Sequence, residues 1–116
     1  MKHAHPHLPK GATVTEHEPN FSHQETEAGG SIYLERDGER VASIDYRRAA
    51  SGAMEVHHTF VDESLRGQGM ARKLVAEAVE HARTTDCKIS PSCSAARAIL
   101  QKTPEYHDVL EAAYLP

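Results

Sequence analysis

The apolar residues of this chain change their spacing at Asp62, and that change limits the folds available to it. Before this point they alternate with polar residues, as at Ile32 and Leu34, which is the pattern of half-buried strands. After it they recur every three to four residues from Met70 to Ala82, which is typical of an amphipathic helix. Strands followed by helices in one short chain indicate an α+β or α/β domain.

Three strands are predicted ahead of this helix. Alternating segments 31–35 and 42–46 flank an Asp37-Gly38 pair, and two such runs around Asp-Gly are typical of a β-hairpin. A third alternating run, 54–61, follows a break at 49–52. The simplest arrangement is a three-stranded antiparallel meander.

Shorter elements are predicted after the first helix, which we expect to end near residues 83–85. Segment 87–90 reads as a short strand that Pro91 stops. Serines at 92 and 94 are candidate caps for a second helix that runs through Leu100. Beyond Pro104 we expect a last helical segment from 105 to about 113.

The segment before the strands has a different composition. Residues 1–28 contain few large apolar side chains and many His, Pro, Glu and Thr residues. We therefore expect a flexible arm over 1–28, with a short strand near 12–16, and one folded domain over 29–116. Histidines in the arm could bind a metal ion, but solvated side chains are the simpler interpretation of such a tract, so no metal site is predicted. These histidines are His3, His5 and His7.

Charge and cysteine content indicate which partners and which cellular compartment to expect. The net charge is −4 and no basic stripe is visible, which argues against a nucleic-acid partner. No run is long and apolar enough to span a bilayer. Cys87 and Cys93 are too few for a disulfide scaffold, and free thiols fit a reducing compartment. We expect a cytoplasmic protein, monomeric or weakly dimeric, that does not bind membranes.

Two glycines stand where the long helix begins, although each costs a helix about 0.5–1 kcal/mol relative to alanine. Gly67 and Gly69 lie beside Arg66. A helix N-terminus leaves backbone amides unpaired and carries partial positive charge, so bare backbone there can admit a phosphate or pyrophosphate. Arg66 would add charge-assisted bonds, and Arg72 and Lys73 could contribute others. The alternative, that the glycines only shape a turn, stays open at this point because short glycine motifs are weak evidence.

The motif and its neighbours resemble a known family. The stretch from Arg66 through Gly69 to Ala71 fits the signature Q/R-x-x-G-x-G/A of the GNAT N-acetyltransferase superfamily. Across residues 31–110, HTFVDESLRGQGMARKLVAEAVEHAR and KISPSCSAARAILQKTPEY resemble a small, truncated GNAT-like family. The resemblance implies a mostly antiparallel central sheet with splayed strands, flanked by two or three helices. It also implies that acetyl-coenzyme A binds along the loop and the preceding strand, at Phe60, Val61, Arg66, Gly67, Gln68, Gly69, Met70, Ala71 and Arg72.

Two residues are the candidates for catalysis. His58 matches the His of the family's His-Thr-x-Val strand and titrates near neutral pH, so it could be a general base or position the substrate. We expect it to share a face with Met54, Val56 and Phe60, unless a bulge changes the alternation. Cys93 matches the family's Pro-x-Cys segment and stands near a helix start, where a thiol has a lowered pKa. It could relay the acetyl group or protonate the leaving thiolate; a small buried core residue is the alternative for it.

The resemblance implies transfer of an acetyl group from acetyl-coenzyme A to an amine acceptor that the sequence does not identify. The chain is short for the superfamily, so the cleft should be open on the acceptor side, which suits a large acceptor such as a protein amine. An open cleft equally suits a non-catalytic acyl-coenzyme A sensor or interaction module.

Overall fold

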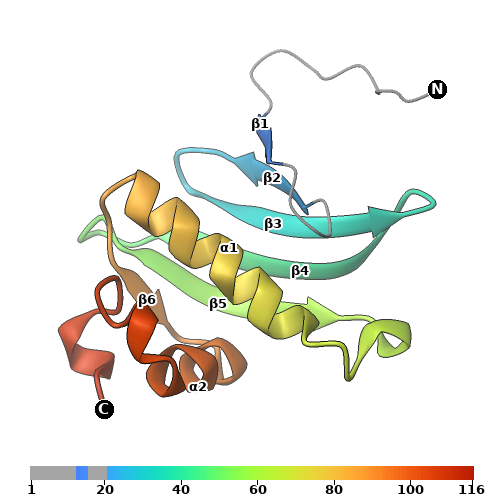
Figure 1. Ribbon diagram of the computed structural model, residues 1–116. Coiled ribbons are helices and arrows are strands. Elements are labelled where there is room, and N and C mark those ends of the chain that lie inside the picture. The colour runs from blue at the N-terminus through green and yellow to red at the C-terminus, as the bar shows by residue number, and fades with distance from the viewer. Residues whose placement is uncertain (1–12, 16–20) are drawn as a thin grey trace.

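The computed structural model describes residues 13–15 and 21–116 (Figure 1). A six-stranded sheet runs in the spatial order β1-β2-β3-β4-β5-β6. Its strands are β1 (Thr13–Thr15), β2 (Phe21–Glu25), β3 (Gly29–Arg36), β4 (Glu39–Arg48), β5 (Met54–Val61) and β6 (Ile89–Pro91). The helices are α1 (Met70–Thr84) and α2 (Ser94–Lys102), with short 3-10 turns at Glu63–Leu65, Pro104–Tyr106 and Ala112–Tyr114.

The sheet is antiparallel from β1 to β5, and only the β5–β6 pair is parallel. A parallel pair needs a crossover connection, and α1 supplies it. At the β3–β4 hairpin Asp37 and Gly38 have φ of 53° and 81°, as the twist-matched two-residue turn requires. The predicted meander and the mostly antiparallel, α+β architecture are confirmed.

Helix α1 lies across one face of the sheet, over β3, β4 and β5 (Figure 1). Its apolar stripe packs against inward-facing residues of the strands, and α2 packs beside α1 and against β5 and β6. The buried residues of α1 are Met70, Leu74, Val75, Ala78, Val79 and Ala82. Within the described chain, neither helix is long and apolar enough to cross a membrane.

The sheet begins earlier than the sequence predicts. Phe21–Glu25 form β2 and pair with β3, and Phe21 is buried in the core. The prediction of an arm up to residue 28 is therefore wrong for this segment. This strand has one large apolar residue and no clear alternation, so its sequence carries no strand pattern, and its pairing with β3 places it in the sheet. The short strand expected near 12–16 is present as Thr13–Thr15, whereas the rest of the expected arm, residues 1–12 and 16–20, lies outside the described residues.

The segment after Pro104 is not a helix, contrary to the prediction for 105–113. It forms two separate 3-10 turns, and between them the chain runs beside β6. The amide of Ile89 donates to the Val109 carbonyl at 2.6 Å, and the amide of Glu111 donates to the Ile89 carbonyl at 3.0 Å. These bonds to β6 replace the bonds that a helix would make to itself.

Ile89 joins β5, β6 and the C-terminal segment, and its side chain is fully buried. Ile89→Ala should lower the free energy of unfolding by about 2–5 kcal/mol, because it leaves a cavity among these three segments. Leu115→Ala is the matched control, since Leu115 is 43% exposed. Urea unfolding followed by circular dichroism measures both, and equal losses would contradict this view of the core.

Candidate functional site

Strands β5 and β6 separate shortly after they meet. Their parallel register ends at Val56 and Pro91. The Val56 carbonyl then accepts hydrogen bonds from the amides of Ser92 and Cys93, both at 3.0 Å, and the chain turns away into α2. No described strand pairs with β5 beyond that point on this side. The predicted splay is confirmed, and it leaves a free edge along residues 57–61.

A bulge in β5 reverses the faces of its side chains. The register places Asp45 opposite His58 and Tyr46 opposite Val56, so His57 has no partner residue. Beyond such an extra residue the alternation is inverted. Thr59, opposite the buried Ile44, therefore lies on the face that α1 covers.

The bulge corrects one of our expectations. Met54 and Val56 are buried under the helices, but His58 and Phe60 are exposed and point to the other face of the sheet. All four were expected to share one face. His58 therefore lies on the face opposite Thr59, and its catalytic role stays a prediction without support from this geometry.

The free edge of β5 presents backbone donors. Asp62 donates its amide to the Val41 carbonyl of β4 at 2.7 Å. Because the direction of N–H groups alternates along a strand, Phe60 also donates toward β4. The amides of Thr59 and Val61 then point to the open edge. The Thr59 amide already donates to the Cys93 sulfur, so Val61 presents the amide that an extended ligand can bind.

Cys93 stands at the point where the strands part. It is the N-cap residue of α2, and its Sγ lies 3.0 Å from the Thr59 hydroxyl. Burial alone would raise the pKa of the thiol, but hydrogen bonds from the Thr59 hydroxyl, the first-turn amides at Ala96 and Ala95, and the Thr59 amide outweigh it. The pKa of Cys93 is therefore held below its usual value, which favours the thiolate.

A carboxylate holds the turn that carries Cys93. Glu55 on β5 accepts a hydrogen bond from the Ser92 hydroxyl at 2.9 Å. The Arg47 guanidinium binds both carboxylate oxygens of Glu55, at 2.9 and 3.3 Å. The chain of contacts from β4 through β5 to Ser92 fixes the residue immediately before the thiol.

The glycine loop lies at the other end of the free edge. Gly67 and Gly69 have φ of 80° and 70°, and a Cβ built on either would meet no atom within 4 Å. The buried Leu65 anchors the loop, while Arg66 and Gln68 are exposed. Positive φ explains why glycine is favoured here, and the open space shows that the protein's own side chains do not occupy the bend.

The N-terminus of α1 is uncapped by side chains. Gly69 is its N-cap residue, and the first turn carries no acidic residue. The first helical bond runs from the Lys73 amide to the Gly69 carbonyl at 3.1 Å. The amides of Met70, Ala71 and Arg72 precede that bond, so they are the groups that an anion can bind. Of these residues only Arg72 has an exposed side chain.

Comparison with known proteins identifies the family. Residues 31–109 match the GCN5-related N-acetyl-transferase family. The chain belongs to that family. A GCN5-like candidate N-acetyltransferase from Staphylococcus aureus is 34% identical, with a TM-score of 0.62, over 77% of this chain and 86% of that one. A GNAT-family protein from Desulfovibrio desulfuricans shares the fold at 15% identity, with a TM-score of 0.50, over 70% of this chain and 53% of that one. Membership of the family makes this protein an N-acetyltransferase by class.

Sequence reasoning placed Cys93 and the glycine loop correctly in the fold but missed Thr59, Glu55 and Ser92. Thr59 had a signal, because it is the second residue of the His-Thr-x-Val segment. Glu55 had none, because its hydrogen bond to Ser92 joins residues 37 positions apart. Ser92 was predicted only as a candidate helix cap, a position that Cys93 takes instead.

The lowered pKa of Cys93 can be tested by its alkylation. In a Cys87→Ser background only Cys93 reacts, so its iodoacetamide rate against pH reports the thiolate fraction. Thr59→Val removes a hydrogen bond to the sulfur, so the pKa should rise and the rate profile should move to higher pH. Thr84→Val, a change at an exposed threonine of α1, should leave the profile in place. If both variants gave the same profile, Thr59 would not favour the thiolate.

Proposed function

We propose that this protein transfers an acetyl group from acetyl-coenzyme A to an amine. The observation that carries the proposal is the free edge of β5, which joins the glycine loop at one end to Cys93 at the other. A long donor with a phosphate group at one end and a reactive carbonyl at the other fits such an arrangement.

The residues present fit acetyl-coenzyme A. The amides from Gly67 to Arg72 would bind its pyrophosphate, with Arg66 and Arg72 adding positive charge. The Val61 amide would bind an amide group of its pantetheine arm, while the Thr59 amide stays on the Cys93 sulfur. Acetyl-coenzyme A supplies the acetyl group as a thioester; the protein's part is to hold that end beside Cys93.

Two roles fit the Cys93 thiol. As a nucleophile, its thiolate would take the acetyl group and pass it to the amine. As an acid, its S–H would protonate the departing thiolate while the amine attacks directly. In either role Thr59 and the start of α2 control the proton on the sulfur.

The acceptor is proposed to be an amine on a large molecule, such as a protein. Beyond β6 the described chain adds only α2 and short turns, so nothing described encloses the site on that side. Small acceptors are normally bound in concave pockets. An amine on the surface of a large molecule needs no such pocket, because that molecule holds the amine in place, and it can reach an open site.

Gly69→Val tests the placement of the donor. The added side chain projects into the open bend, so coenzyme A binding measured by calorimetry should weaken at least tenfold. Gly38→Val is the matched control, because Gly38 also has positive φ and open surroundings but lies in a hairpin turn. Both variants should lose roughly 1–2 kcal/mol of stability from backbone strain. Unchanged affinity in Gly69→Val would refute the phosphate placement.

Cys93→Ala tests the reacting end. With acetyl-coenzyme A and an amine, the wild-type chain should release free coenzyme A, and the variant should do so at least ~100-fold more slowly. Cys87→Ala is the control and should keep the wild-type rate. An acetyl adduct in the intact mass, lost in Cys93→Ala, identifies the relay; Cys93-dependent release without an adduct identifies the acid. Binding of the donor without release by the wild type would overturn the proposed activity.

A further inference from the structure

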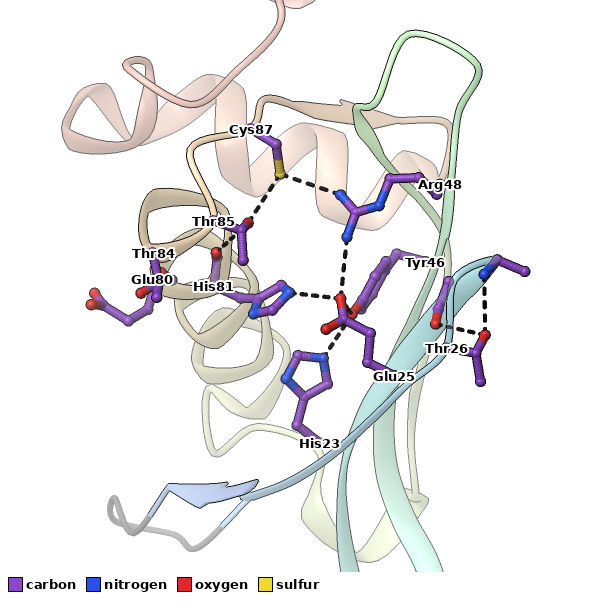
Figure 2. Close-up of polar contacts among 12 residues, drawn as sticks. His23, Glu25, Thr26, Tyr46, Arg48, Glu80, His81, Thr84, Thr85 and Cys87 are labelled. Carbon is purple, nitrogen blue, oxygen red and sulfur yellow. Dashed lines mark hydrogen bonds and ion pairs between the residues drawn. The ribbon is translucent and has the colours of Figure 1, made fainter. Parts of the chain in front are cut away.

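A cluster of metal-binding side chains lies away from the β5 edge, between β2 and the C-terminal end of α1 (Figure 2). His23 and Glu25 stand two residues apart on β2 and so share a face. His81 lies in the last turn of α1. One ligand atom from each of the three lies within 4.8 Å of the other two. We propose that His23, Glu25 and His81 bind a divalent transition-metal ion that joins β2 to α1.

The ligand set suits zinc or a neighbouring first-row metal. Two imidazoles and one carboxylate, with a fourth position open to water, form a common zinc environment. Ligands about 2.0–2.1 Å from a tetrahedral zinc lie about 3.3 Å from one another. The 2.9 Å contact between His81 Nε2 and Glu25 Oε2 is a hydrogen bond that already holds these two side chains together. Side-chain rotations would bring the metal-binding atoms to the zinc spacing, because all three residues are at least partly exposed.

The hydrogen bonds leave a lone pair on each imidazole. The ionised carboxylate of Glu25 can only accept, so Tyr46 must donate its O–H to it. In the 2.7 Å contact between His23 and Tyr46, His23 Nε2 must then be the donor. His81 Nε2 likewise donates to Glu25. Each ring, when neutral, therefore keeps an unprotonated Nδ1 that can bind a metal.

The two histidines of the cluster are in direct contact. The two imidazole rings meet edge to face, with centroids 4.4 Å apart. This contact keeps both imidazoles within reach of one metal ion.

The same carboxylate is oriented by two more donors. Tyr46 at 2.7 Å and Arg48 at 3.1 Å both bind Oε2 of Glu25. The hydrogen bonds that described residues make to Glu25 end on Oε2, so Oε1 is the oxygen proposed to bind the metal. Donors on the other oxygen are the outer contacts that typically orient a metal-binding carboxylate. The positive charge of Arg48 also repels a cation, so Arg48 should weaken the site without abolishing it.

Zinc binding to the full-length chain tests the proposal. Histidines of the N-terminal segment could compete for zinc, so the measurements use a chain in which four of them are alanine: His3, His5, His7 and His17. Calorimetry of this metal-free protein with zinc chloride should show one saturable site per chain. His81→Ala and Glu25→Gln should each weaken it at least tenfold, and Arg48→Gln should tighten it because a competing charge is removed.

His58→Ala is the matched control, because His58 is exposed on the other face of the sheet; zinc affinity should not change. Circular dichroism confirms that each variant is folded. Absence of a saturable site would overturn the proposal and leave the cluster as a hydrogen-bonded link between β2 and α1. Binding that both His81→Ala and Glu25→Gln left unchanged would overturn it equally, because the zinc would then lie elsewhere.

Discussion

The site depends on a single carbonyl group, that of Val56, which binds the amides of both Ser92 and Cys93. If β5 and β6 had continued to pair, the Val56 carbonyl would have accepted one amide and a later carbonyl of β5 would have accepted the next. Sharing the carbonyl ends the pairing of β5 with β6 and starts α2. Because the two amides share one carbonyl, β5 keeps a free edge beyond Val56, and the thiol of Cys93 is placed at the start of α2.

The bulge at His57 decides which side chains meet on that edge. One unpaired residue turns Thr59 toward Cys93 and His58 to the far face. Sequence motifs could place both residues on the correct strand, because periodicity and motif order are local properties. They could not assign the faces beyond residue 57, since a bulge arises from the register between two strands and leaves no mark on the spacing of one.

The same distinction explains what was predictable of the fold. Strands β3, β4 and β5 and both helices carry strong periodic patterns, and the structure confirms them. Strand β2 and the segment after Pro104 take their conformation from a neighbour: β3 for the former and Ile89 of β6 for the latter. The hydrogen bond between Glu55 and Ser92 was not predicted for a similar reason, because tertiary contacts between distant residues have no sequence period.

Positive φ does not by itself mark a binding loop in this chain. Gly38 and Gly52 also have positive φ and open space where a Cβ would lie, yet each belongs to a turn between strands. Gly67 and Gly69 differ in what surrounds them: a helix start without a side-chain cap and the unpaired edge of β5. Under the proposed binding of acetyl-coenzyme A, the glycines are therefore needed twice, once for the backbone conformation and once for access to the amides beside them. Only the second need sets them apart from turn glycines, and it depends on the same parting of strands that positions Cys93.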